Sequence, residues 1–355
     1  MTRVNPQFWK GKKVFLTGHT GFKGSWLSMW LQFMGAEIKG FSLVPKTSPA
    51  LFSEANIAEH MESVVGDIRN RDIVLESMRQ FNPDIVIHMA AQPLVRVSYR
   101  EPIDTYSTNI MGTIHVLEAS RYCSNLRAVV NVTTDKCYAN NEWVWGYRED
   151  DPMGGFDPYS SSKACSELVT NAYRSSFLQK NGIAVATARA GNVIGGGDWS
   201  EDRLIPDIFN AFENNQPVII RNPKATRPWQ HVLEPLSGYL VLAERLYNDG
   251  QIFAEAWNFG PNDQDVQTVQ WIVEKMTLDW NHQENSKIES TAQPHEANYL
   301  KLDISKAKNK LGWEPSWDLA IAIEKIIKWH QSWLSGVNTQ ALCIEQIKEF
   351  QNEVI

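Results

Sequence analysis

The stretch Thr17-Gly18-His19-Thr20-Gly21-Phe22-Lys23-Gly24 decides the fold of this chain. It follows a short apolar run and opens a segment whose apolar residues recur at helical spacing. Gly18 permits a tight turn, Gly21 lets a pyrophosphate approach the backbone, and Gly24 lets the helix pack closely on a sheet. We therefore predict a strand, a phosphate-binding loop and a helix whose positive end faces the phosphate charge.

Strand-like and helix-like segments alternate behind this loop. Strands are predicted at Val14–Leu16, Glu37–Leu43, Ser63–Val65, Ile85–His88, Ala128–Val132 and Ala184–Arg189. Helices are predicted at Ser25–Met34, Asp72–Gln80, Asp104–Arg121 and Ser160–Gln179. The alternation, with strands that are nearly all apolar, predicts an α/β protein built on a doubly wound parallel (Rossmann) sheet.

The second half of the chain is less regular. Gly191 to Asp202 is rich in Gly, Asn and Asp and is expected to be a loop. Helices are expected at Arg203–Asn214 and Val232–Tyr247, and strands at Pro217–Ile220 and Ala256–Phe259. We expect residues 1–190 to form the nucleotide-binding domain, with 230–260 returning to it. Residues 191–355 then form a smaller, discontinuous, mostly C-terminal lobe that binds substrate.

Composition excludes several classes of protein. The net charge of −7 over 355 residues shows no excess of positive charge of the kind that binds nucleic acid. The eight histidines show no metal-ligand spacing, so no metal is expected. The four cysteines lack a C-x-x-C pair, which favours reduced thiols in a cytoplasmic protein. We expect no secretion signal, because Met1 to Lys13 lacks an apolar segment, and no membrane span, because no apolar run reaches the ~18 residues that one needs.

A tyrosine and a lysine one helical turn apart provide the candidate chemistry. Tyr159 and Lys163 share one helix face, and Asp157-Pro158 resembles a helix start just before them. A cation near the phenol favours the phenolate, which is a usable base. Thr134, Asp135 and Lys136 follow a predicted strand, so they are expected at the same sheet edge. These are more proton-transfer groups than an alcohol oxidation needs, which indicates a further reaction step.

At this point the chain resembles an extended short-chain dehydrogenase/reductase, over roughly Lys13 to Trp313. His88-Met89-Ala90-Ala91-Gln92 is similar to the family's alanine-rich turn after the fourth strand, and Asn109 to an asparagine of its next helix. Arg189-Ala190-Gly191-Asn192-Val193-Ile194-Gly195 resembles the segment that leads to the sugar-nucleotide phosphates. Arg227 opens a segment similar to the family's later Arg-x-x-x-x-Val.

The closer resemblance is to the sugar-nucleotide 4,6-dehydratases, which commonly carry Thr-Asp-Glu where this chain has Thr134-Asp135-Lys136. The Thr-Asp-Lys-Cys-Tyr version and Thr17 to Leu27 resemble the members that act on CDP-glucose in deoxysugar (lipopolysaccharide-type) biosynthesis. The resemblance implies that Tyr159 and Lys163 support oxidation at C4, with Thr134 orienting the oxygen. Asp135 would be the acid at C6 if its pKa is raised. Lys136 would be the base at C5 if neutral, or would stabilise the enolate as a cation.

The resemblance also implies NAD as cofactor, although the second predicted strand carries no acidic residue for the ribose. Asp67 is a candidate for the adenine amine. The expected cofactor-binding residues are Thr17, Gly18, Thr20, Gly21, Phe22, Lys23, Gly24, Asp67, Ile68, Ala90, Ala91, Gln92, Asn109, Tyr159 and Lys163. The expected substrate-binding residues are Asn192, Arg203, Arg221, Arg227, His295 and Tyr299. A homodimer or homotetramer is expected, paired through the helices Asp104–Arg121 and Ser160–Gln179.

Two other functions stay open from the sequence. One is another enzyme of the same fold, a 4-epimerase or a dehydratase for a different nucleotide sugar. Asp135 and Lys136 argue against the epimerase, because epimerisation has no elimination step. The other is a non-catalytic nucleotide-binding protein, against which the retained Tyr159 and Lys163 argue.

Overall fold

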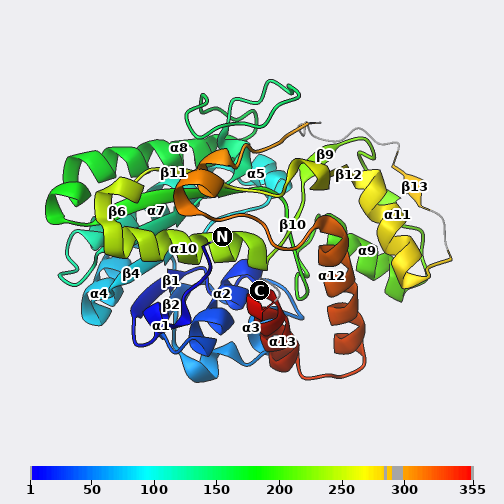
Figure 1. The fold of residues 1–355 in the computed structure, drawn as a ribbon, viewed down its shortest axis with the longest axis horizontal. Coiled ribbons are helices and arrows are strands. Elements are labelled where there is room, and N and C mark those ends of the chain that lie inside the picture. The colour runs from blue at the N-terminus through cyan, green and yellow to red at the C-terminus, as the bar shows by residue number, and fades with distance from the viewer. Residues whose placement is uncertain (1, 284–285, 290–298, 353–355) are drawn as a thin grey trace.

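The protein is built around one twisted sheet, seen in a computed structural model that describes residues 2–283, 286–289 and 299–352 (Figure 1). The sheet has seven strands in the order β11-β6-β5-β4-β1-β2-β3, and every pairing in it is parallel. The strands are β1 Lys13–Thr17, β2 Glu37–Ser42, β3 Glu62–Val65, β4 Ile85–His88, β5 Ala128–Val132, β6 Ala184–Ala190 and β11 Ala256–Phe259. The predicted doubly wound α/β fold is thereby confirmed.

Helices cover both faces of the sheet (Figure 1). One face is covered by α2 Phe22–Phe33, α10 Leu233–Asp249 and α13 Thr339–Asn352, over a core rich in tryptophan. The other is covered by α4 Arg71–Phe81 and α7 Gly112–Ser120, and α8 Pro158–Tyr173 lies beside α7. Strands β4, β5 and β6 are buried along their whole length, as their apolar sequences predict.

Two predicted long helices contain a π-helical turn. The segment predicted at Asp104–Arg121 consists of α6 Pro102–Tyr106, a π turn at Ser107–Met111 and then α7. The other is α8, which continues into a π turn at Arg174–Leu178. The first π turn contains the buried Asn109, whose side-chain amide forms hydrogen bonds with two neighbouring segments. Such turns are favoured by tertiary contacts of this kind, which local sequence does not reveal.

The smaller lobe has its own core. Helices α9 Leu204–Glu213, α11 Val269–Trp280 and α12 Leu319–Leu334 pack their apolar faces together. Among the described residues, this part of the chain also contains three two-stranded pairs: β7 Val193–Ile194 with β10 Gln230–His231, β9 Thr226–Pro228 with β12 Val266–Thr268, and β8 Ile219–Ile220 with β13 Lys287–Ile288. The remaining short helices are α1 Pro6–Trp9, α3 Leu51–Glu54 and α5 Val95–Arg100.

Some predicted boundaries were wrong. Helix α2 begins at Phe22, three residues before the predicted Ser25, because the backbone of Gly21 caps it and Gly24 fits in its first turn. The predicted loop Gly191–Asp202 contains β7, because two of its residues pair with β10. The predicted strand Pro217–Ile220 is shorter in the structure, where β8 spans Ile219–Ile220 and the Val218 oxygen also accepts from the Lys287 amide at 2.9 Å.

Two further observations concern the described residues as a whole. None of their helices has the length and apolar character to cross a bilayer. All four cysteines are free thiols, in agreement with the reduced state that their spacing predicts.

Candidate active site

The residues predicted to carry chemistry meet at the carboxyl edge of the sheet. Thr17 ends β1, Met89 and Ala90 follow β4, and Thr133 and Thr134 follow β5. Hydrogen bonds join the first two loops, since the Thr17 hydroxyl accepts from the backbone amides of Met89 and Ala90, both at 3.1 Å. In an open parallel sheet this edge is where ligands bind.

Two glycines shape the loop that precedes α2. Gly18 has φ of +78°, and a Cβ there would lie 2.8 Å from the backbone nitrogen of Ala90. At Gly21 a Cβ would meet only the Gly18 oxygen, at 3.5 Å, so the space in front of the helix is open. No side chain caps this twelve-residue helix, and its first amides are available to an anion. The cradle therefore fits the pyrophosphate of a dinucleotide cofactor.

The other predicted cofactor residues are held by bonds of their own. Thr20 donates to the Leu43 oxygen at 2.8 Å. Asn109 accepts from the Gln92 amide at 2.8 Å and donates to Ser162 on α8 at 2.9 Å. Asp67 receives three hydrogen bonds from Arg69, which hold the pKa of its carboxyl below the ordinary value. Asn109 thus positions two segments of the site.

Helix α8 brings Tyr159 and Lys163 to the edge. Its N-cap, Asp157, accepts from the Ser160 amide at 2.8 Å, as the sequence predicts. Tyr159 lies in the first turn, and Lys163 lies one turn later, donating to the Val132 oxygen at 3.2 Å. Both side chains are buried. The lysine thereby ties the helix to the end of β5, two residues before Thr134.

Thr134 and Asp135 face the tyrosine. The Thr134 hydroxyl donates to one Asp135 carboxylate oxygen at 3.0 Å and is also hydrogen-bonded with Tyr159. The other oxygen of Asp135 is buried without a hydrogen-bond partner among the described residues. Burial raises the pKa of Asp135, against the opposing charge of Lys136 and the bond from Thr134. The condition set for Asp135 as an acid, a raised pKa, is confirmed in direction.

The pKa of Tyr159 differs from the sequence-based expectation, which was a lowered value. Burial raises it to about 12, although the bond with Thr134 and the charge of Arg203 act in the other direction. The expectation was wrong for the unliganded protein because a phenolate is poorly solvated in this buried position. Burial also lowers the pKa of the Lys163 amine to about 8.

The predicted substrate residues divide into near and distant groups. Arg227 is buried and its charge acts on Asp135, while Arg203 acts on Tyr159. Arg221 pairs instead with Asp202 at 3.1 Å, and Arg203 itself pairs with Asp198 at 3.1 Å. Of the three other candidates, two have backbone contacts in the structure and one lies outside the described residues. Asn192 accepts from the Gln230 amide, Tyr299 bridges Thr226, and His295 lies outside the described residues.

Sequence reasoning missed a buried ion pair beneath the site. Arg189, expected to lead to substrate phosphates, is 3% exposed and binds the Glu167 carboxylate through two nitrogens, both at 2.9 Å. Glu167 also accepts from the hydroxyls of Thr133 and Thr187. The pair therefore supports the strand end that carries Thr134. Its signal was the buried charge of Glu167, one turn after Lys163 on α8.

Sequence reasoning also missed Tyr239. Its wholly buried hydroxyl accepts a hydrogen bond from the amine of Lys23 at 3.1 Å. The two residues lie 216 positions apart, on α10 and in the first turn of α2. No local pattern could have joined them.

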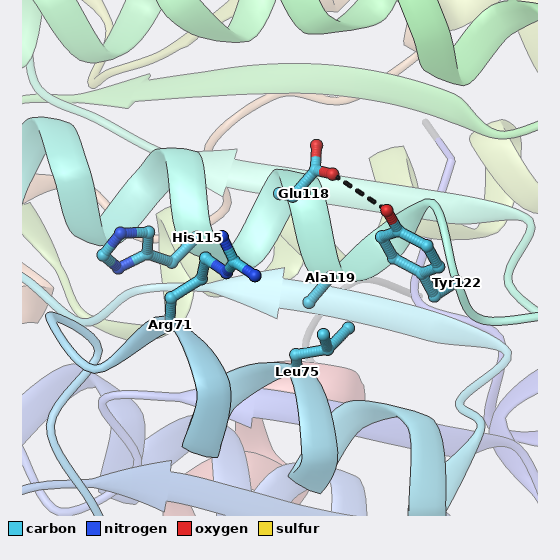
Figure 2. Close-up of a pocket in the computed structure, with 6 residues that line it drawn as sticks. All are labelled: Arg71, Leu75, His115, Glu118, Ala119 and Tyr122. Atoms are coloured by element: carbon cyan, nitrogen blue, oxygen red, sulfur yellow. Dashed lines mark hydrogen bonds between the residues drawn. The ribbon is translucent and has the colours of Figure 1, made fainter.

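A shallow polar pocket lies elsewhere, between α4 and α7 (Figure 2). Arg71, His115, Glu118 and Tyr122 line it, and Tyr122 donates to Glu118 at 3.3 Å. It contains none of the predicted site residues. Within the described ranges, no group of three or more His, Cys, Asp or Glu side chains is arranged to hold a metal ion.

A Rossmann sheet, an open glycine cradle and a Tyr/Lys pair beside a threonine define an enzyme of the extended short-chain dehydrogenase/reductase class. Within that class, the chain belongs to the GDP-mannose 4,6 dehydratase family, whose model matches residues 15–326. A CDP-glucose 4,6-dehydratase of Salmonella typhimurium is 55% identical over 98% of this chain and 99% of its own length.

Solved structures show the same fold. A dTDP-glucose 4,6-dehydratase from Bacillus anthracis in complex with NAD has a TM-score of 0.76 and 21% identity, covering 91% of this chain and 97% of that one. A UDP-glucose 4-epimerase from Thermotoga maritima with UDP-glucose has a TM-score of 0.79 and 21% identity, covering 91% and 99%. The fold thus occurs with both dehydratase and epimerase chemistry.

Proposed function

We propose that this enzyme converts CDP-D-glucose into CDP-4-dehydro-6-deoxy-D-glucose and water, using NAD. The observation that carries the proposal is the Asp135 carboxyl, which is buried beside Thr134 and Tyr159 with one oxygen unpartnered and a raised pKa. An epimerase has no leaving hydroxyl for such an acid to protonate. The 55% identity to a CDP-glucose 4,6-dehydratase supports the choice of substrate.

The residues present fit NAD. Thr17, Gly18, Gly21 and Gly24 form the cradle for its pyrophosphate, and Lys163 is the candidate for its nicotinamide ribose. When bound, NAD would supply the hydride acceptor for oxidation at C4 and the hydride donor for reduction at C6. The structures with bound NAD that share this fold are consistent with that choice.

Oxidation requires Tyr159 to take the proton of the C4 hydroxyl. A phenol with a pKa of about 12 holds its own proton at neutral pH, so this pKa must fall in the loaded enzyme. The charge of Arg203 already acts to lower this pKa, and we assign Lys163, one turn further along α8, to assist it. Thr134 is assigned to orient the C4 oxygen.

Elimination then removes water across C5 and C6. The C4 ketone acidifies the C5 proton, which we assign to Lys136, and the C6 hydroxyl leaves with the proton of Asp135. The half-buried Lys136 directly follows that acid in the chain, so base and acid come from one strand end. A protonated carboxyl in a desolvated site is suited to this role.

Substrate binding is assigned to the smaller lobe. We assign Arg227 and Arg203 to the diphosphate, because guanidinium groups match phosphate oxygens and the charges of both act on the catalytic cluster. Arg221, Asn192, Tyr299 and His295 are proposed for the remaining contacts. We further infer a cytoplasmic homodimer or homotetramer that serves deoxysugar biosynthesis of the lipopolysaccharide type.

Incubation with CDP-, UDP-, GDP- and dTDP-glucose tests the proposal. The 4-keto-6-deoxy sugar is expected from CDP-glucose alone, without net reduction of NAD. Product is followed by the absorbance of the keto sugar in alkali and by mass spectrometry. Formation of a 4-epimer, or turnover of another nucleotide sugar in preference to CDP-glucose, would contradict it.

A further inference from the structure

A second lysine–tyrosine pair faces the catalytic cluster from the side of the glycine cradle. Lys23 lies in the first turn of α2, and its amine donates to the Tyr239 hydroxyl at 3.1 Å. The same amine lies 5.1 Å from the centre of the Tyr239 ring. Tyr239 is wholly buried on α10, so it fixes the direction of the lysine side chain.

Positive charge is concentrated around this amine. Lys163 from α8 and Arg203 from the segment before α9 act on it, and the carboxyl of Asp135, from the strand end after β5, opposes them. Tyr239 in turn is affected by Tyr159 and Asp135, which places the second pair within range of the first. Desolvation, followed by the repulsion from Lys163 and Arg203, lowers the pKa of Lys23 to about 7.

A pyrophosphate bound in the glycine cradle would favour the charged form of the Lys23 amine, whereas burial and the nearby cations favour the neutral form. The open space in front of Gly21 fits a pyrophosphate, which brings two negative charges to the helix turn that carries Lys23. An anion beside an amine favours the charged form of the amine. We propose that Lys23, held by Tyr239, takes up a proton when the dinucleotide cofactor binds, which makes cofactor affinity depend on pH. This inference rests on the proposed use of NAD.

The sign follows from linkage. Below the pKa of the free protein the amine is already charged, so binding takes up no proton and affinity is independent of pH. Above that value each unit of pH weakens binding about tenfold, until the raised pKa of the complex is reached. Affinity for NAD is therefore expected to fall between pH 7 and pH 9.

Isothermal titration of the cofactor-free protein with NAD measures this directly, without sugar substrate. At pH 8, titrations in phosphate and in Tris give the number of protons taken up, because the two buffers differ in ionisation enthalpy. Lys163 also titrates near this range, with a pKa of about 8, so it is the matched control. Lys23→Arg keeps a positive charge at every pH used and should remove the Lys23 share of the uptake. Lys163→Arg should retain that share.

The outcomes separate the hypotheses. Uptake that is reduced in Lys23→Arg but retained in Lys163→Arg supports the proposal. Uptake that depends only on Lys163 overturns it. Lys23→Met serves if the arginine variant does not fold, and it should bind NAD more weakly and with less pH dependence than wild type. NAD binding with unchanged proton uptake in both Lys23 variants would leave the proposed dehydratase function intact, whereas failure of wild type to bind NAD would overturn the cofactor as well.

Discussion

Two buried carboxyl groups at the same sheet edge behave in opposite ways. Glu167 is satisfied by Arg189 and by the hydroxyls of Thr133 and Thr187. Desolvation alone would raise its pKa, but Arg189 and these bonds leave it below the ordinary value. Asp135 has one oxygen without a hydrogen-bond partner among the described residues, and burial raises its pKa.

The difference distinguishes a carboxylate that stabilises the fold from a carboxyl that can transfer a proton. A carboxylate whose lone pairs are all engaged is fixed in charge and contributes to stability, because loss of either partner leaves a buried charge uncompensated. A carboxyl held beside a tyrosine with a free oxygen can bind and release a proton. The sequence pattern points to Asp135 through its place after Thr134, but it gives no sign that Glu167 has its partners in Arg189, Thr133 and Thr187.

The sharpest way to break the comparison is Asp135→Asn. Loss of the acid is expected to lower kcat about 10²- to 10⁴-fold, because the C6 hydroxyl then leaves unprotonated. The free energy of unfolding should change little or rise, since a desolvated carboxyl is removed. Steady-state kinetics with CDP-glucose and urea unfolding measure the two quantities. A large loss of stability with normal kcat would mean that Asp135 supports the fold as Glu167 does.

Glu167→Gln should show the reverse. Arg189 would keep its charge in a buried site without a counter-ion, which typically costs about 3–5 kcal/mol. Urea unfolding measures the loss. Glu76→Gln on the exposed face of α4 is the matched control and should stay within about 0.5 kcal/mol of wild type. If the Glu167 variant were as stable as that control, the ion pair would not contribute to the stability of the fold.

Lys136→Ala tests the assignment of the C5 base. Oxidation at C4 should persist while elimination stops, so reduced cofactor should accumulate with a loss of dehydrated product of about 10²-fold or more. Absorbance at the nicotinamide band and product analysis distinguish the two steps. Full turnover would exclude Lys136 as the base.

A smaller effect is expected for Asn109→Ala. Its amide joins the backbone of Gln92 to Ser162 on α8, so its removal leaves buried groups unpaired at a cost of about 1–3 kcal/mol. Thermal unfolding measures that cost. KM for NAD should also rise, since the Gln92 loop is a proposed cofactor contact. Unchanged stability would show that another group replaces the amide.

The smallest expected effect is on the pH dependence of the free energy of unfolding, to which the two carboxyls contribute with opposite sign. The lowered pKa of Glu167 adds stability above pH 4.5, its ordinary value, and that stability is lost as pH falls through the folded-state pKa. The raised pKa of Asp135 acts in the opposite sense, so stability is lost as pH rises from 3.8 through its folded-state value. Urea unfolding across pH 3 to 8 in each variant should remove one dependence and keep the other. The activity of the wild type should fall at high pH as Asp135 loses its proton. The residual activity of Asp135→Asn should not show this loss, because the asparagine does not ionise.

Much of the architecture was predictable from local sequence. The strand–glycine–helix unit at Thr17 to Gly24 and the apolar strands carry their own periodicity, and all were found in the predicted parallel sheet. The Asp157 cap was predictable because capping is a local bond. These features depend on residues within a few positions of each other.

The rest depends on contacts between distant residues. Arg189 and Glu167 lie on a strand and a helix, and their buried ion pair forms only when these two elements pack together. Lys23 and Tyr239 meet only after the chain has completed most of its fold. The raised pKa of Tyr159 depends on how completely neighbouring elements enclose it, which no spacing records. Charge state and partner choice therefore required the three-dimensional structure.

The place of β11 has a consequence for protein synthesis. This strand closes the edge of the sheet beside β6, but it emerges from the ribosome 66 residues after β6 ends. At about 5–20 residues per second, β6 has an unpaired edge for roughly 3–13 s. During that interval the nascent sheet offers its backbone to any extended chain nearby. Chaperone demand should therefore be greatest while residues 191–255 are being translated, and fragments that end near residue 190 should aggregate.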